Sequence, residues 1–128
     1  MIKGVEVALL NLTSENFKET ISGEGIVLID CWAAWCNACK EFQPVFEEVA
    51  GKYPDHTFAK LDTQAEEDLV KSLEVEHIPT LLLFKEGIML FKQPGYFDLK
   101  GLDDILAQAQ SIDMNEVRAY MEKQEKEE

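Results

Sequence analysis

Two cysteines three positions apart, Cys36 and Cys39, stand at the junction between two segments of different pattern. The residues before them, 26–32, form a nearly continuous apolar run, which is typical of a strand buried on both faces. The residues after them, to about 52, place apolar side chains on one helical face. A thiolate at the start of a helix is stabilised by the free N–H groups and the dipole. The spacing and its context therefore predict a redox pair that interconverts between dithiol and disulfide.

Strand and helix patterns alternate through the rest of the chain. Strands are predicted over about 5–9, 26–32, 57–61, 80–84 and 88–91, and helices over about 15–21, 36–52, 63–73 and from 98 onward. Thr13 or Ser14 is expected to cap the first helix, and residues 63–66, TQAE, form a capping box before the third. The tight turn at 85–87 predicts that the last two strands pair antiparallel. This order favours an α/β fold in which a mixed sheet of about five strands carries helices on both faces.

The composition sets the broad class of protein. A length of 128 residues suits one domain with a single core. Twelve basic against 25 acidic residues give a net charge of −13, so neither nucleic acid nor an anionic membrane surface is an expected partner. The sequence has no apolar window near the roughly 18 residues of a membrane span, and its start does not resemble a secretion signal. Three cysteines are too few for a disulfide-built secreted scaffold, so we expect a cytoplasmic protein.

The composition changes beyond residue 111, where we divide the chain into a domain, 1–111, and a C-terminal extension, 112–128. The extension carries apolar residues at helical spacings of three and four: Met114, Val117, Tyr120 and Met121. We expect this amphipathic segment to dock on its own domain in a monomer, and a dimer contact is the alternative. The charged last seven residues are expected to be mobile.

Four sequence features together resemble the thioredoxin family. Residues 30–40, DCWAAWCNACK, match the family's Asp-x-Trp-Ala-x-Trp-Cys-x-x-Cys-Lys run, and residues 75–80, VEHIPT, match Val-x-x-Ile-Pro-Thr. Pro44 stands at the family's helix-kinking proline, and Gly95 matches the glycine after the antiparallel edge strands. The resemblance covers roughly residues 5–110. It implies the three-layer thioredoxin-like fold, with a cis peptide bond before the proline of VEHIPT.

Cys36 is expected to be the nucleophile, because a helix start offers about 2 kcal/mol of dipole and N–H stabilisation to a thiolate. Cys39, one turn deeper, would then resolve the mixed disulfide formed on Cys36. The resemblance places Asp30 beneath Cys39, as the group that exchanges protons with it. Burial should raise the pKa of the Asp30 carboxyl enough for this task near neutral pH. An inert, hydrogen-bonded aspartate is the alternative interpretation.

The resemblance also implies a substrate site around the cysteine pair. Trp35 would shield the thiolate and offer an apolar contact. The backbone of Ile78, before Pro79, would hold an extended peptide by strand-like hydrogen bonds that ignore side-chain identity. Gly95 would leave room on the other side of the cleft, and a plain turn glycine is the alternative.

Four more residues are expected near the site. Trp32 should pack beneath it. The resemblance implies that Lys60, on the next strand, pairs with the buried aspartate, as a matching lysine does in the family, and a plain surface lysine is the alternative. His77 either stabilises the thiolate when protonated or is a solvent-facing loop residue. Cys31 alternates with Asp30 along its strand, so it should face the opposite side as an inert core thiol.

Asn37 and Ala38 separate the cysteines where thioredoxins proper have Gly-Pro. Without that proline the start of the helix is less rigid. We therefore predict a redox potential less reducing than that of the Gly-Pro proteins, and about 30 mV corresponds to about 1.4 kcal/mol.

Three other functions compete with the redox interpretation. A purely structural disulfide would close so short a loop that it adds only about 2 kcal/mol of stability. Zinc needs four ligands, and Cys36 and Cys39 have no second pair at finger-like spacing, although an iron–sulfur cluster bridged by two chains would find four thiolates. A protein-binding module on the same fold would have no use for a buried carboxylate under a dithiol.

The sequence holds no phosphate-binding glycine loop and no dinucleotide fingerprint. No cofactor or metal is therefore predicted, and electrons would have to come from another protein. The resemblance implies protein disulfides as substrates, and a flavin-containing thioredoxin reductase or a similar dithiol donor as the partner.

Overall fold

The computed structural model describes residues 9–126 of the chain. Its strands are β1 (Leu10–Asn11), β2 (Ile26–Trp32), β3 (Thr57–Asp62), β4 (Thr80–Lys85) and β5 (Ile88–Pro94). Its helices are α1 (Phe17–Ile21), α2 (Asn37–Lys52), α3 (Glu67–Ser72), α4 (Leu99–Ser111) and α5 (Met114–Lys126). Within these residues no helix combines the length and the apolarity that crossing a bilayer requires.

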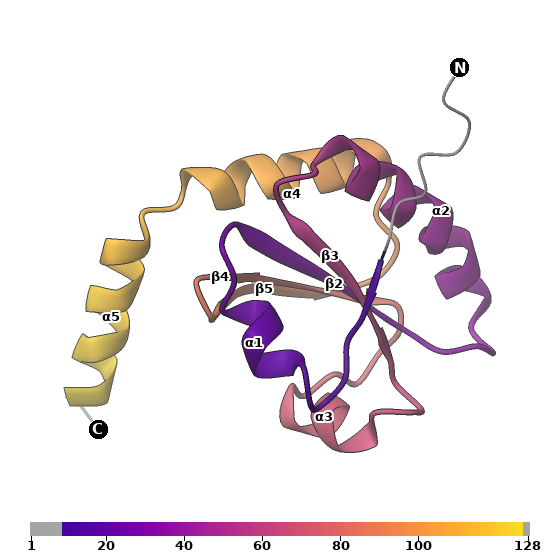
Figure 1. The fold of residues 1–128 in the computed structure, drawn as a ribbon, viewed down its shortest axis with the longest axis horizontal. Helices are drawn as coiled ribbons and strands as arrows, with labels where there is room; N and C mark the ends of the chain where they lie inside the picture. The colour runs from indigo at the N-terminus through magenta and orange to yellow at the C-terminus, as the bar shows by residue number, and fades with distance from the viewer. Residues whose placement is uncertain (1–8, 127–128) are drawn as a thin grey trace.

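The five strands form one mixed sheet in the order β1-β3-β2-β4-β5 (Figure 1). β3 runs parallel to both β1 and β2, whereas β4 pairs antiparallel with β2 and with β5. In this register Asp30 lies opposite Lys60 on one side and Leu81 on the other. The predicted α/β architecture, including the antiparallel pairing of the last two strands, is confirmed.

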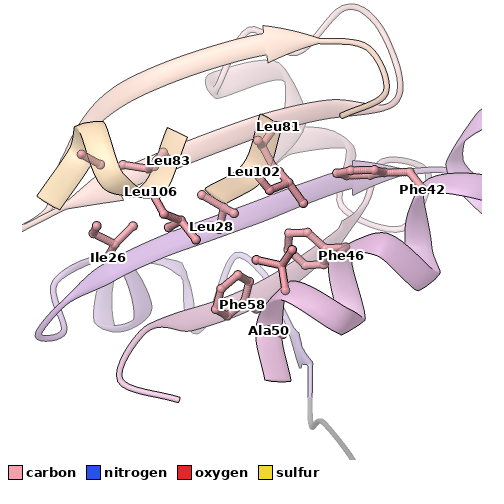
Figure 2. Close-up of a cluster of buried hydrophobic side chains, with 12 residues drawn as sticks. Ile26, Leu28, Phe42, Phe46, Ala50, Phe58, Leu81, Leu83, Leu102 and Leu106 are labelled. Carbon is pink, nitrogen blue, oxygen red and sulfur yellow. The ribbon is translucent and has the colours of Figure 1, made fainter. Parts of the chain in front are cut away.

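Helices cover both faces of the sheet. Even-numbered residues of β2, Ile26 and Leu28, pack with α2 and α4 in the larger core cluster (Figure 2). Odd-numbered residues of the same strand pack on the other face with residues of α1 and α3. Cys31 belongs to that second cluster and is fully buried, and burial raises the pKa of its thiol, so it is the inert core thiol predicted.

The first elements differ from the sequence prediction. The strand predicted over 5–9 lies almost entirely outside the described residues, and β1 consists of two residues further along. Helix α1 begins at Phe17, and neither Thr13 nor Ser14 caps it. The physical reason is a local turn: the Asn16 amide oxygen accepts the N–H of Thr13, and the Thr13 hydroxyl accepts the N–H of Asn16. These two hydrogen bonds have the reciprocal pattern of a capping box, but they close the turn over residues 13–16, and α1 begins only after that turn.

The capping box predicted at 63–66 is also wrong. The Thr63 hydroxyl donates to the carbonyl of Trp32 at 3.0 Å, and the Glu66 carboxylate accepts the N–H of Ser14 at 3.0 Å. Both side chains therefore connect distant parts of the chain, and α3 begins only at Glu67. The carboxylate of Asp62 accepts the N–H groups of the two residues after Thr63 instead.

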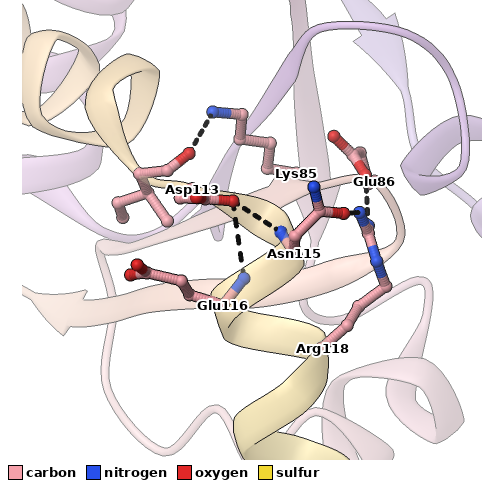
Figure 3. Close-up of polar contacts among 7 residues, drawn as sticks. Lys85, Glu86, Asp113, Asn115, Glu116 and Arg118 are labelled. Atoms are coloured by element: carbon pink, nitrogen blue, oxygen red, sulfur yellow. Dashed lines mark hydrogen bonds and ion pairs between the residues drawn. The ribbon is translucent and has the colours of Figure 1, made fainter.

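Helix α5 extends away from the domain (Figure 1), and only its first turn is docked. Met114 is buried, whereas Tyr120 is 64% exposed and Met121 is 42% exposed. Arg118 forms an ion pair with Glu86 near this first turn (Figure 3). The sequence predicted that this helix docks on the domain along its whole apolar face. The prediction is confirmed for Met114 and is wrong for Tyr120 and Met121, which are exposed.

The α5 helix also runs to Lys126 instead of ending before the charged last seven residues. Its start is fixed by the turn that precedes it. The Asp113 carboxylate accepts the N–H of Asn115 at 2.9 Å (Figure 3). The Lys85 ammonium donates to the carbonyls of Ala109 and Ile112. Lys85 thus connects the end of β4 to the end of α4, where helix carbonyls attract a cation.

Candidate active site

Cys36 and Cys39 are joined by a disulfide at the start of α2, with their Cα atoms 5.2 Å apart. Cys36 is the N-cap residue of the helix, and its sulfur accepts the backbone N–H of Cys39 at 3.2 Å. A sulfur in this position faces a helix N–H group and the positive end of the dipole. The same environment stabilises the Cys36 thiolate once the disulfide is reduced.

The chain brings the cysteines to this place by a short turn after β2. The N–H of Cys36 donates to the carbonyl of Ala33 at 3.1 Å, which closes the turn between the strand and the helix. Ala33 is fully buried, and Trp32 and Ile78 pack against the group it forms with the two cysteines. Cys36 is 7% exposed and Cys39 is 3% exposed, so both residues are buried and Cys36 is the more exposed of the two.

Asp30 is a fully buried carboxyl on β2, and neither of its oxygens has a hydrogen-bond partner among the described residues. Burial raises the pKa of Asp30 to about 7, and the charge of Lys60 opposes this rise. The direction agrees with the sequence prediction, and the hydrogen bonds of the alternative interpretation are not found. A carboxyl with this pKa is able to take up or release a proton near neutral pH.

Lys60 does not make the direct contact with Asp30 that the sequence suggested, although it is its register partner. Its ammonium donates to the amide oxygen of Gln43 at 2.6 Å and lies 4.3 Å from the ring centroid of Trp32. It is also half-buried, so it is not the plain surface lysine of the alternative. Sequence reasoning missed Gln43, whose one signal is its position four residues after Cys39 on the same helical face.

The loop before β4 supplies the other wall of the site. The Ile78–Pro79 peptide bond is cis, as the resemblance implied, and Ile78 packs against the cysteine pair. The carbonyl of Pro79 accepts the N–H of Gly95 at 2.8 Å. Gly95 has a φ of +118°, which favours glycine on backbone grounds, and a Cβ atom there would meet nothing within 4 Å.

The remaining predicted site residues are exposed. Trp35 is 65% exposed beside the cysteines, and Asn37 and Ala38 lie on the outer side of the first turn of α2. His77 is also exposed, and among the described residues no hydrogen bond holds its imidazole. Its carbonyl accepts the hydroxyl of Thr80 at 2.5 Å.

A pocket of about 260 Å³ lies between the end of β2 and the first turns of α2, beside Cys39. It is lined by Trp32, Ala33, Ala34, Cys39, Lys40 and Gln43. The part of the chain from 9 to 126 contains no group of three or more side chains suited to hold a metal ion. The indole N–H of Trp32 is buried without a partner among these residues.

A cysteine pair at the start of a helix, directly after a strand that carries a buried carboxyl in a five-stranded mixed sheet, defines the class of thioredoxin-fold proteins with a redox-active cysteine pair. The family model described as Thioredoxin matches residues 8–108 of this chain. The protein therefore belongs to the thioredoxin family.

Named relatives agree with this assignment. A Streptomyces coelicolor protein named "Putative thioredoxin 2" is 41% identical over 116 residues, which is 91% of this chain and 87% of that protein. A thioredoxin of Staphylococcus haemolyticus is 38% identical over 101 residues, 78% of this chain and 96% of its own. A solved mutant thioredoxin from Halobacterium salinarum aligns with a TM-score of 0.77 at 26% identity, covering 87% of this chain and 98% of the other.

Proposed function

We propose that this protein is a thiol–disulfide oxidoreductase that reduces disulfides in other proteins through Cys36 and Cys39. The observation that carries the proposal is the N-cap position of Cys36, whose sulfur accepts the N–H of Cys39 at 3.2 Å. A negative charge on that sulfur is favoured by the helix, and only a thiolate attacks a disulfide. The second sulfur, one turn inward, is close enough to form a disulfide with the first.

The reaction begins with both cysteines reduced. The Cys36 thiolate attacks one sulfur of a substrate disulfide, a new S–S bond forms, and the substrate's other sulfur leaves as a thiolate that takes a proton from water. The Cys39 sulfur, once deprotonated, attacks the Cys36 sulfur and expels the second substrate thiolate. Two electrons pass to the substrate, and the protein is left with the Cys36–Cys39 disulfide.

Asp30 is proposed to accept the Cys39 proton in the second step. Its pKa of about 7 makes the carboxylate a base at neutral pH, and the same carboxyl returns the proton when the disulfide is reduced again. Its burial and its lack of partners leave it free for this exchange.

Substrate binding is proposed to use the wall opposite the cysteine helix. Trp35 is exposed and offers an aromatic surface beside Cys36. The backbone at Ile78 and Pro79 would pair with an extended substrate segment by main-chain hydrogen bonds. The loop at Gly95, bonded to Pro79, would border the same cleft.

Electrons are proposed to come from a flavin-containing thioredoxin reductase or another dithiol donor, in a reducing cytoplasm. The thioredoxin names of the relatives support this partner class.

Insulin reduction tests the proposal, with dithiothreitol as the electron donor so that no particular reductase is needed. The natural protein should accelerate insulin precipitation, Cys36→Ser should abolish the acceleration, and Cys31→Ala should retain it as the matched control. A protein-binding module would show no acceleration, and its binding would survive Cys36→Ser.

A further inference from the structure

The ammonium group of Lys60 is held at a fixed place beside the active site. It donates to the Gln43 amide oxygen at 2.6 Å and lies 4.3 Å from the ring centroid of Trp32. The Gln43 amide nitrogen in turn donates to the carboxylate of Glu47 at 2.9 Å. Gln43 therefore has both of its polar ends engaged, and its amide is oriented with the oxygen toward Lys60.

The surroundings of Asp30 offer no comparable partner. On β3 its register partner is Lys60, and on β4 the residue opposite is the apolar Leu81. The buried residues that α2 and α4 bring to this face of the sheet, such as Phe42 and Leu102, are apolar. The charged group whose field acts on Asp30 is thus Lys60.

A lysine ammonium and a buried, unpartnered carboxylate attract each other strongly in a medium of low dielectric constant. In this protein they sit on adjacent strands at the same register, yet no hydrogen bond or ion pair joins them in the described residues. The ammonium is bound instead to a neutral amide and an aromatic face. The amide oxygen of Gln43 is the polar contact that competes with Asp30 for this cation.

We propose that Gln43 is a positioning residue, which holds the Lys60 ammonium over Trp32 and so leaves the Asp30 carboxyl unpaired and able to exchange a proton with Cys39. The inference deepens the proposed oxidoreductase function, on which its catalytic consequence rests. Gln43 contacts neither substrate nor sulfur in this role and acts through Lys60.

Gln43→Met is the variant of choice, because methionine fills a similar volume and cannot accept the Lys60 hydrogen bond. The freed ammonium should approach Asp30 and lower the pKa of its carboxyl by roughly one unit, the lower end of the effect of an adjacent cation. The ¹³C NMR titration of aspartate-labelled, oxidised protein measures this pKa, and the signal missing from Asp30→Asn identifies the resonance.

Two further variants test whether Gln43 acts on the pKa of Asp30 through Lys60, or whether any substitution of Gln43 disturbs the packing of the site. Gln43→Glu keeps an acceptor oxygen, so the pKa of Asp30 should not fall in it. In a Lys60→Met background, Gln43→Met should no longer lower that pKa. An unchanged or raised pKa in Gln43→Met, an equal fall in Gln43→Glu, or a fall that persists without Lys60 would each overturn the inference.

The catalytic consequence appears in the pH profile of insulin reduction. In the proposed mechanism the rate rises with pH as the Asp30 carboxyl loses its proton. The midpoint of this rise should move to lower pH in Gln43→Met, by the same shift in pKa that NMR measures. A protein inactive toward insulin at every pH, with the NMR shifts as expected, would overturn the proposed function and leave the Gln43–Lys60 relationship standing.

Discussion

The backbone N–H of Gly95 donates to the carbonyl oxygen of Pro79 at 2.8 Å, so the loop after β5 is fastened to the cis peptide beside the cysteine pair. This bond continues the antiparallel pairing of β4 and β5 one residue beyond the Thr80–Pro94 pair. It fixes the two loops that, in the proposed mechanism, border the substrate cleft. A glycine is favoured here by its backbone, because its φ of +118° is a value that other residues rarely adopt.

Gly95→Ala should lower the free energy of unfolding by about 1–3 kcal/mol, the usual cost of an unfavourable backbone conformation. Crowding would not contribute, since a Cβ atom at this position meets nothing within 4 Å. Urea denaturation measures the loss. Gly23→Ala is the matched control, because its φ is ordinary and its nearest neighbour would be 3.5 Å away, so it should cost much less. Equal effects at the two glycines would contradict the assignment.

Asp30→Asn should stabilise the oxidised protein at alkaline pH and have little effect at pH 4. The folded protein binds the Asp30 proton up to a pH of about 7, whereas the unfolded chain loses it near 3.8. The stability that this proton provides is complete below pH 4 and is lost as the pH rises to about 7. At about 1.4 kcal/mol per pH unit, this loss is on the order of 4 kcal/mol at most.

Urea denaturation of both proteins between pH 4 and pH 8 checks this prediction. The difference between them should grow in favour of Asp30→Asn as the pH rises. Asp55→Asn, at an exposed aspartate, is the matched control and should show little of this trend. A difference that instead grew on acidification would mean that Asp30 is stabilised in its charged form.

Replacing Asn37-Ala38 with Gly-Pro should make the protein more reducing. Proline at the second position of α2 restricts the first turn of the helix without removing a hydrogen bond that the helix needs. We expect the potential to fall by at least about 30 mV, which is about tenfold in the equilibrium constant. Equilibration with a dithiothreitol buffer at pH 7 measures it, and Asn37→Gly alone should not lower it. An equal or higher potential in the double replacement would refute the role assigned to these residues.

Removing residues 113–128 should leave insulin reduction unchanged. The family match ends at residue 108, and Lys85 remains bonded to the carbonyl of Ala109 at the end of α4. The loss of buried Met114 should cost about 2 kcal/mol of stability, while the partly exposed Arg118–Glu86 pair adds little. Loss of activity in a truncated protein that still unfolds cooperatively would assign the extension a part in catalysis.

Short local sequence patterns predict many of the elements of this fold. The apolar run of β2, the apolar stripe of α2 and the turn at 85–87 each specify an element from a few neighbouring residues, and the structure contains all of them. The cysteine pair was placed correctly for the same reason, because a strand followed directly by an amphipathic helix leaves one position for it.

Contacts between distant residues account for what the sequence did not predict. Thr63 looked like a helix cap, yet its hydroxyl bonds the carbonyl of Trp32 across the sheet edge. The family resemblance implied that Lys60 pairs with Asp30 on the adjacent strand, yet its hydrogen-bond partner is Gln43, on a helix 17 residues earlier. Local patterns do not encode which of several polar groups a half-buried polar side chain reaches in three dimensions.

In the proposed mechanism Cys36 captures the substrate and Cys39 releases it. The most direct test mixes the reduced Cys39→Ser variant with insulin and maps the disulfide-linked adducts by mass spectrometry. We expect a mixed disulfide to accumulate on Cys36 in Cys39→Ser, and none to accumulate in the Cys36→Ser variant. Adducts on Cys31, or no adduct in Cys39→Ser at all, would contradict it.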